Sequence, residues 1–528
     1  MGRGAGVAAR PGRGSIAAPR RPPPGTSAAA CWHSGPARLH PWARAAYPES
    51  GTMRGRRVVF RRLTDGVARG IEGAVSTVSE TFFEPVIRVG VTGLSRAGKT
   101  VFITGLVANL LDRGRMPQLR AHAEGRIEAV FLQPQPDDTL PRFDFENHLA
   151  AILGEDPRWP SSTRSISELR LSFRVRPSGM ISGLTGPRTV HLDIVDYPGE
   201  WLLDLSLLDK SYAQWSEETL KRLATREEAR DFMATARAAD GSLPLEETQA
   251  QALAASFTAY LQAARKAGWS DCTPGRFLLP GDLAGSPVLT FAPLPMPAQA
   301  TRTSLWREMG RRYESYKENV VRPFFREHFA RIDRQVVLVD ALGAIHAGPQ
   351  ALEDLRRTMA EILTAFRPGR NSFLSTLLLG HRVERILFAA TMADHLHHTQ
   401  HPKLTAIMEA MLREARDRAA FAGSLTAAMS LASIRATVEE EVTRHGETVE
   451  AVRGRLLANG RQVAMYPGEL PSDPSRILSP AREGVERWLD AEFALMTFAP
   501  ARVLLKPGEG PPHIRLDRAA EFLIGDRL

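Results

Sequence analysis

The 528-residue sequence predicts an α/β fold, with a mainly parallel sheet flanked by helices. Short apolar runs of strand length recur along the chain, and two of them end in polar motifs that contain glycine. Between residues 201 and 330, apolar and aromatic residues instead recur at helical spacing. Apolar strands alternating with helical patterns are typical of parallel sheets buried on both faces. We therefore expect a sheet domain with an inserted helical domain and a C-terminal α+β extension.

The net charge of +9 is confined to the N-terminal part of the chain. Residues 1–62 hold twelve arginines and one acid, Glu49, which gives +11 and leaves −2 for the other residues. The folded part is near neutral, so no specific nucleic-acid partner is predicted. The two cysteines, Cys31 and Cys272, allow no disulfide framework and no cysteine zinc site, which fits a reducing, cytoplasmic setting. No apolar run reaches the ~18 residues of a membrane span, and a secretory signal is missing.

Residues 1–52 are rich in Arg, Pro, Gly and Ala without apolar periodicity, which is typical of disorder. We expect a disordered basic tail or a start assigned too early, with Met53 as the working initiator; a targeting peptide is the alternative. Residues 53–84 are expected to form an amphipathic helix. Because arginines precede its apolar stripe, residues 54–80 are candidates for peripheral membrane contact, although docking on the protein's own surface is the preferred interpretation.

Residues 93–100 read G-L-S-R-A-G-K-T, the pattern of a phosphate-binding loop (P-loop). An apolar strand is predicted before it over 86–91, and an amphipathic helix after it over 102–111, which is the context that the pattern requires. Backbone N–H groups of such a loop cradle phosphate oxygens, Lys99 would reach the β- and γ-phosphates, and the Thr100 hydroxyl would bind Mg²⁺. The candidate nucleotide-binding residues are Gly93, Ser95, Arg96, Ala97, Gly98, Lys99, Thr100 and Val101. The sequence thus predicts a bound nucleoside triphosphate with Mg²⁺ as its cofactor.

A second motif follows a later strand in the first half of the sheet domain. This first half is predicted over 85–200. A strand over 169–175 follows a polar loop in which Thr163 is a candidate Mg²⁺ ligand. The strand over 190–195 ends in D-Y-P-G-E, where Asp196 would lie beside Mg²⁺ and the Gly199 N–H against the γ-phosphate. Loss of that phosphate would free the loop, which is how a nucleotide switch works.

Residues 201–330 are predicted to form the helical insertion, and 331–440 the second half of the sheet domain. In the insertion, aromatic and apolar residues step by three and four from Trp306 to Val320 and form its predicted core, and Pro323 is expected to end that helix. The second half carries strands over 336–340, 386–390 and 428–434. Residues 441–528 are expected to be a C-terminal extension packed on the sheet domain.

The strand over 386–390 ends in T-M-A-D, which matches the guanine-reading pattern [N/T]-K-x-D at Thr391, Met392 and Asp394. The Asp394 carboxylate can accept hydrogen bonds from the ring N–H and the exocyclic amine of guanine, and adenine offers neither in that geometry. Ala432 and Ser433 are expected to lie behind the base. His395, His397, His398 and His401 follow; the His397/His401 spacing suits a metal, but a solvated polar loop is the preferred interpretation.

These motifs together resemble the bacterial YcjX-like proteins, which are Ras-like P-loop GTPases with an inserted helical domain. The resemblance runs from about residue 54 to the C-terminus. Its blocks are G-L-S-R-A-G-K-T (93–100), S-T-R-S-I-S-E-L-R-L (162–171), L-D-I-V-D-Y-P-G-E-W-L-L-D (192–204), L-F-A-A-T-M-A-D-H (387–395), L-A-S-I-R-A-T (431–437) and H-I-R-L-D-R-A-A-E-F-L-I-G-D-R-L (513–528). The resemblance implies GTP and GDP binding, Mg²⁺ dependence, a cytoplasmic setting and a stress-associated role.

One departure concerns the base loop, because similar proteins carry lysine where this chain has Met392. We expect weaker nucleotide affinity, with Asp394 preserving the guanine preference. For hydrolysis, Glu200 stands where many Ras-like proteins place a water-orienting glutamine, and Arg96 and Arg164 are candidates for stabilising transition-state charge.

Three functions stay open on the sequence alone. The preferred one is a slow GTPase switch that reports nucleotide state to a protein effector through the helical insertion. Met392 keeps open an ATPase with relaxed base specificity. Glu200 keeps open a nucleotide-stabilised scaffold with negligible turnover.

Overall fold

The computed structural model describes residues 84–93, 97–161, 165–178, 186–365, 383–413, 424–444, 446–483, 493 and 495–528. All of them belong to one compact unit, residues 72–528. The basic tail over 1–52 and nearly all of the helix predicted over 53–84 lie outside the described residues. Within the described part of the chain, no helix has the length and apolar character needed to cross a membrane.

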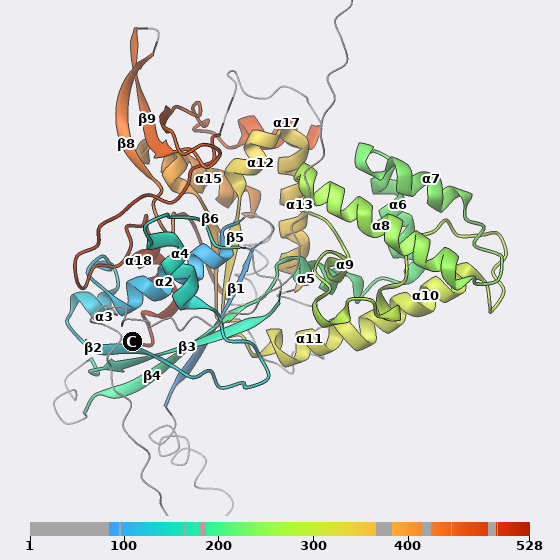
Figure 1. Cartoon of the computed structure of the whole chain (residues 1–528), viewed down its shortest axis with the longest axis horizontal. Coiled ribbons are helices and arrows are strands. Elements are labelled where there is room, and N and C mark those ends of the chain that lie inside the picture. Colours follow the sequence, from blue (N-terminus) through green and yellow to red (C-terminus); the bar gives the residue numbers. More distant parts are fainter. Residues whose placement is uncertain are drawn as a thin grey trace, which may run out of the picture. The chain divides into compact units, whose positions relative to one another are not determined.

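Within the described residues, seven strands form one sheet in the order β2-β3-β4-β1-β5-β6-β7 (Figure 1). Strands β4, β1, β5, β6 and β7 are mutually parallel, whereas β3 is antiparallel to both of its neighbours. This arrangement confirms the predicted mainly parallel sheet. The strands span Val86–Gly93 (β1), Ile127–Gln133 (β2), Ser167–Val175 (β3), Arg188–Asp196 (β4), Arg334–Val339 (β5), Arg385–Ala390 (β6) and Leu425–Ser430 (β7).

Helices cover both faces of this sheet, and every residue of β5 is therefore buried. Val336 and Leu338 belong to one apolar core, and Val337 and Val339 belong to the other, because successive strand residues point to opposite faces. The first core includes residues of α2 (Lys99–Leu111), α3 (Arg120–Ala123), α4 (Phe145–Leu153) and α18 (Leu516–Ile524). The second includes residues of α12 (Ala341–Ala347), α13 (Pro349–Ala365), α15 (His401–Met411) and α17 (Ser475–Glu483).

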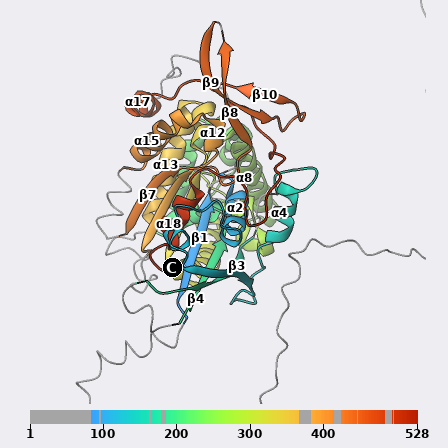
Figure 2. The same cartoon turned by 90° about the vertical axis from the view of Figure 1, so that its left-hand side faces the viewer.

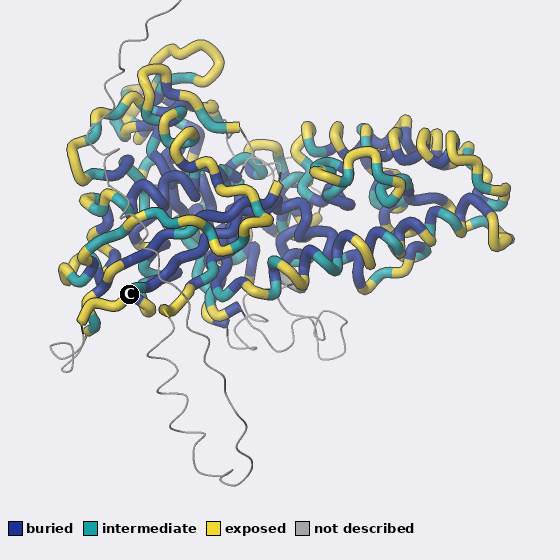
Figure 3. Tube along the Cα trace, turned by 60° about the horizontal axis from the view of Figure 1, so that its bottom comes forward, coloured by how far each residue is buried: buried dark blue, intermediate teal, exposed yellow. Residues whose placement is uncertain are grey.

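Residues 200–331 are mainly helical, and their apolar residues continue the second core. Figure 3 shows buried residues along one side of these helices and exposed residues along the other. The segments are α5 (Glu200–Leu203), η2 (Asp204–Leu207), α6 (Tyr212–Leu223), η3 (Glu227–Ala229), α7 (Arg230–Ala238), α8 (Glu247–Ala267), α9 (Gly275–Leu278), η4 (Gly281–Leu283), η5 (Pro287–Leu289), α10 (Leu305–Tyr316), η6 (Lys317–Val321), α11 (Arg322–Glu327) and η7 (Phe329–Arg331).

Two predicted boundaries are wrong. Pro323 does not end its helix, because a π-helical turn over Lys317–Val321 links α10 to α11, and Pro323 occupies the first turn of α11, where a missing N–H is tolerated. The last strand of the large sheet is Leu425–Ser430 rather than 428–434. Leu431 donates its N–H to Ala390 O, and beyond it Ala432 pairs with Ile514 instead of β6, so the strand ends there.

After β7, the described residues form a second sheet of three antiparallel strands (Figure 2), which agrees with the α+β character predicted for the C-terminal extension. It consists of β8 (Thr437–Arg444), β9 (Glu447–Arg455) and β10 (Gln462–Met465). Its apolar core is small, with Ala436, Val452, Met465 and Phe498 buried. The boundary expected at residue 440 falls inside β8.

The C-terminal residues pack on the large sheet through a buried arginine. Arg334, at the start of β5, is 1% exposed, and its guanidinium donates to Leu523 O at 2.8 Å and to Asp526 Oδ1 at 2.6 Å. It also reaches Glu384 Oε2, at 2.6 Å, just before β6. A buried guanidinium is stable only when such partners satisfy its donors, so these contacts fix the C-terminal segment to the parallel strands.

Candidate functional site

The loop between β1 and α2 requires glycine at two described positions. Gly98 precedes α2 with φ 75° and ψ 28°, the left-handed region that glycine adopts without strain. A Cβ at Gly93 would lie 2.9 Å from Leu338 Cβ and 3.1 Å from Ala97 Cβ, so a side chain there would clash with β5 and the loop. Ser95 and Arg96 lie outside the described residues; Ala97 is buried and Val101 partly exposed.

Lys99 and Asp196 meet at the carboxyl ends of two adjacent strands. Because β1 and β4 pair in parallel, Val91 is in register with Asp196, and the Lys99 Nζ lies 2.5 Å from Asp196 Oδ1. Asp196 is fully buried, and the side chain of Lys99 is only 11% exposed. Thr100 follows Lys99 in the first turn of α2 and is also buried. An ammonium, a carboxylate and the N-terminus of a 13-residue helix are thus gathered at one edge of the sheet. Thr163 and Arg164 lie outside the described residues.

The D-Y-P-G-E segment leads from β4 directly into the insertion. The Tyr197 hydroxyl donates to Gln335 Oε1 at 2.7 Å, and the segment then turns at Gly199 into α5. Glu200, the first residue of α5, is 6% exposed, and its Oε1 lies 3.0 Å from the Arg265 guanidinium of α8. The candidate catalytic carboxylate is therefore engaged by a residue of the insertion.

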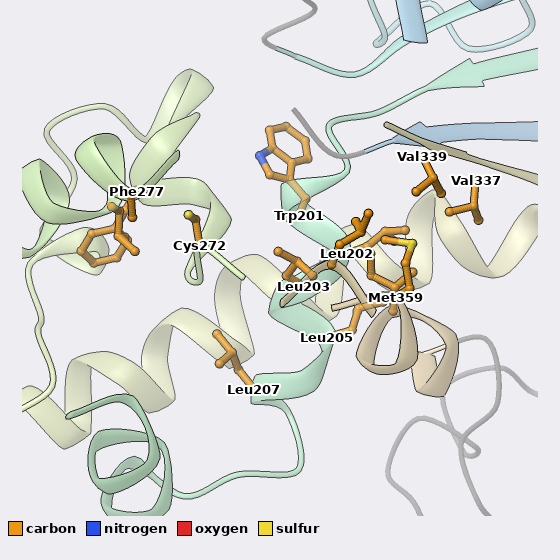
Figure 4. Packing of buried hydrophobic residues seen from close by; sticks show 14 of the residues in the cluster. Trp201, Leu202, Leu203, Leu205, Leu207, Cys272, Phe277, Val337, Val339 and Met359 are labelled. Atoms are coloured by element: carbon orange, nitrogen blue, oxygen red, sulfur yellow. The ribbon is translucent and has the colours of Figure 1, made fainter. Parts of the chain in front are cut away.

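A buried carboxylate fixes the start of the insertion. Asp204 Oδ1 accepts the Gly275 N–H at 2.7 Å, and Oδ2 accepts the Tyr316 hydroxyl at 2.6 Å. Burial raises the pKa of Asp204 to about 7, although these hydrogen bonds oppose the shift. Figure 4 shows the apolar side of the same segment, where residues from Trp201 to Leu207 lie between the β5 and α13 residues on one side and the insertion residues Cys272 and Phe277 on the other.

We expect the Asp204→Asn substitution to change how stability depends on pH. Unfolded Asp204 loses its proton near pH 4, whereas the folded carboxyl keeps it to about pH 7, so wild-type stability falls as pH rises through that window and is level above it. As the pH rises from 5 to 8, the free energy of unfolding of the variant should increase by about 3 kcal/mol relative to that of wild type. Thermal unfolding of both proteins across this range measures the difference. The pKa of Asp354 is also raised to about 7, but it titrates in both proteins. Parallel pH profiles would contradict the prediction.

The predicted base loop follows β6 and is held in a strained conformation. Met392 has φ 58° and ψ 32°, which a non-glycine residue adopts rarely. Asp394 is 4% exposed; its Oδ2 accepts the Ala436 N–H at 2.7 Å, and Oδ1 lies 3.4 Å from His395 Nδ1. Burial alone would raise the pKa of Asp394, but the His395 side chain and the Ala436 N–H outweigh burial and lower it. Asp394 is thus an ionised acceptor in a buried position. The Thr391 hydroxyl donates a hydrogen bond to Val339 O.

The loop that contains Ala432 and Ser433 lies between α2 and the C-terminal segment. Ala432 forms a two-way bridge with Ile514, with N···O distances of 3.1 and 2.8 Å. A Cβ at Gly105 of α2 would lie 2.7 Å from Ser433 O, so α2 approaches this loop closely. This contact brings the helix that follows the predicted phosphate-binding loop next to one of the two predicted base loops. Ile514, Gly105 and Arg265 are not predicted from the sequence, because each contacts a site residue that is distant in the chain. Ile514 pairs with Ala432, Gly105 lies against Ser433, and Arg265 contacts Glu200.

The histidines that follow the base loop divide into two groups. His401 is buried, with Nε2 2.7 Å from Ala393 O and Nδ1 3.2 Å from the Arg515 guanidinium. Both ring nitrogens of His401 therefore have hydrogen-bond partners in the protein, Ala393 O and the Arg515 guanidinium, and His401 does not share a metal site with His397. His397 and His398 face glutamates of β8 and β9 instead.

Comparison with known proteins places this arrangement in a family. A model described as "YcjX-like family, DUF463" matches residues 87–528. The chain is 37% identical over 456 residues to "Ras-like GTPase YcjX" of Escherichia coli (strain K12), an alignment that covers 84% of this chain and 96% of that relative. It is 35% identical over 468 residues to the protein of the same name from Shewanella oneidensis, covering 84% of this chain and 94% of the relative. The chain belongs to the YcjX-like family.

Proposed function

We propose that this protein binds GTP and hydrolyses it to GDP and phosphate with Mg²⁺. The observation that carries the proposal is the contact between Lys99 and Asp196 at the end of a β1–loop–α2 unit whose Gly98 is left-handed. A buried ammonium paired with a buried carboxylate at the N-terminus of a helix is the arrangement that a triphosphate and its cation need. The relatives named Ras-like GTPase support the same activity.

In this proposal the ammonium of Lys99 leaves Asp196 for the β- and γ-phosphates when nucleotide binds. The N–H groups at the start of α2 and that of Gly199 donate to phosphate oxygens. The Thr100 hydroxyl and the Asp196 carboxylate are oxygen donors that suit Mg²⁺, with Thr163 as a further proposed ligand. The ion would neutralise charge on the phosphates.

Asp394 is proposed to select guanine. Its carboxylate is buried and its pKa is lowered, so it can accept both guanine donors in addition to the Ala436 N–H, and a base without those donors would gain no hydrogen bond from it. The half-buried Met392 offers an apolar stem along the base without the charge of a lysine. Ala432 and Ser433 back the base in this proposal.

Turnover is proposed to be slow, because the Glu200 carboxylate is engaged by Arg265. The same contact supports a switch in which the D-x-x-G loop reports nucleotide state to the helical insertion and, through it, to a protein effector. Arg96 and Arg164 are proposed to stabilise charge during hydrolysis. A cytoplasmic, stress-associated role belongs to the same proposal.

Competition binding of GTP and ATP in the presence of Mg²⁺ tests the base specificity. Wild type should prefer GTP by about 100-fold or more, and Asp394→Asn should lose most of that preference because a buried amide cannot accept both guanine donors. Met392→Lys should tighten GTP binding and keep the preference. Equal affinity for the two nucleotides in wild type and in Met392→Lys would favour an ATPase. Tight GTP binding without phosphate release would instead favour a nucleotide-stabilised scaffold, which the Glu200–Arg265 contact also fits.

A further inference from the structure

A cluster of two histidines and two glutamates joins the segment after the base loop to the three-stranded sheet. His397 and His398 precede or begin the short helix η9 (His398–Gln400), and Glu439 and Glu450 lie on β8 and β9. Ligand atoms of His397, His398 and Glu439 all lie within 4.8 Å of one another. We propose that these three side chains form a site for a divalent transition-metal ion such as Zn²⁺, separate from the proposed nucleotide site.

The two histidines approach the same carboxylate oxygen. Glu439 Oε2 lies 2.7 Å from His398 Nδ1 and 3.7 Å from His397 Nε2. Two ligand atoms on a tetrahedral zinc ion, with bonds of about 2.0–2.1 Å, are roughly 3.3 Å apart. The two separations from Glu439 lie on either side of that value, and all three ligand atoms lie within 4.8 Å of one another, so side-chain rotations would bring them to one ion.

The second nitrogen of His397 is already oriented for this role. His397 Nδ1 lies 3.1 Å from Glu450 Oε2 and 3.0 Å from the Thr399 hydroxyl oxygen, and that hydroxyl itself donates to Glu450. A carboxylate only accepts hydrogen bonds, so Nδ1 is the nitrogen that donates to Glu450, and Nε2, which lies on the side of Glu439, is the nitrogen that would bind the ion. A carboxylate behind a metal-binding histidine is the usual second layer of a zinc site.

The ligand set fits a borderline metal better than Mg²⁺. Two imidazoles and one carboxylate suit Zn²⁺, Co²⁺ or Ni²⁺, whereas Mg²⁺ prefers oxygen ligands. His398 is 64% exposed, which leaves an entry path and room for a water ligand, while the side chain of His397 is 11% exposed. Arg435 contacts the other carboxylate oxygen, Glu439 Oε1, at 3.5 Å, and so leaves Oε2 to the histidines. The ion would tie β8 to the chain segment that follows Asp394.

Cobalt titration of the full chain, free of affinity tags and chelator-treated, tests the site. With excess Mg²⁺ present to occupy oxygen-only sites, wild type should bind one Co²⁺ with visible absorption bands, and Zn²⁺ should displace it. Glu439→Gln and His398→Ala should each weaken binding by at least about tenfold, and Glu450→Gln, which loses the orienting acceptor, by about tenfold. The matched control is Glu440→Gln, whose side chain pairs with Arg453.

The readout is the cobalt spectrum and the dissociation constant, so it does not depend on GTP hydrolysis. Unchanged thermal unfolding of the metal-free variants shows that they fold. If wild type gave no saturable cobalt spectrum, or if Glu439→Gln bound as tightly as Glu440→Gln, the site would be refuted. An unaltered dissociation constant in Glu450→Gln would overturn the orienting role of Glu450.

Discussion

The Lys99→Met variant is expected to lose GTP hydrolysis, with phosphate release falling by about 100-fold or more, because the proposed charge stabilisation of the β- and γ-phosphates is removed. Methionine keeps the apolar stem of the lysine and deletes only its ammonium. GTP affinity should fall as well, since the same ammonium is proposed to contact the phosphates in the ground state. Phosphate release at saturating GTP and nucleotide binding together measure the two effects.

The variant also loses the ion pair between Lys99 and Asp196 in the nucleotide-free protein. A control for stability is therefore needed. Lys99 Nζ lies 2.5 Å from the buried Asp196, and deleting one partner of a buried ion pair costs about 3–5 kcal/mol. The melting temperature of Lys99→Met should therefore fall, and activity is to be compared below it. Lys403→Ala, which removes a surface lysine paired with Glu469, should leave both properties unchanged. Phosphate release within threefold of wild type in Lys99→Met would refute the proposed role of Lys99.

Substituting Gly275 by alanine is expected to destabilise the protein by about 3 kcal/mol or more, one of the largest effects of a single methyl group in this fold. A Cβ at Gly275 would lie 2.2 Å from Glu200 O and 2.5 Å from Glu200 C, and these backbone atoms cannot rotate away. Either α9 or α5 must move, and the Gly275 N–H would then withdraw from Asp204. Thermal unfolding measures the loss.

Gly186→Ala is the matched control, because a Cβ there has no atom of the described residues within 4 Å. It should change the melting temperature little. In Gly275→Ala, the displacement also reaches the proposed nucleotide site, since Glu200 directly follows Gly199. Reduced GTP affinity is therefore expected at temperatures where the variant is still folded. A melting temperature equal to that of Gly186→Ala would show that α5 and α9 are not packed as described.

The three nucleotide motifs could be predicted because each follows a buried strand. The carboxyl ends of parallel strands meet at one edge of a sheet, and this topology predicts Lys99, Asp196 and Asp394 at that edge. The structure confirms the sheet and brings Lys99 to Asp196, while their roles toward a nucleotide stay predictions.

What the sequence did not reveal depends on weak patterns or distant contacts. Strand β2 is not among the strands predicted from the sequence; it is an edge strand with mainly half-exposed residues. Strand β8 reads T-V-E-E-E-V-T-R, whose three successive glutamates hide any alternation. The contact of Glu200 with Arg265 depends on how the insertion folds back, and nothing in the local pattern of either residue indicates it.

The bridge between Ala432 and Ile514 also has a consequence for synthesis of the protein. The loop proposed to back the base is held by a residue 82 positions further along the chain, close to the C-terminus. Strand β5 pairs with β1, with Val91 in register with Val336. This pairing can likewise form only after the whole helical insertion has been synthesised. Contacts of such long sequence separation form late, because loop closure must precede them. A chain that has not yet been synthesised as far as residue 514 therefore lacks the contact that holds this loop, and the proposed nucleotide site would be incomplete at that stage.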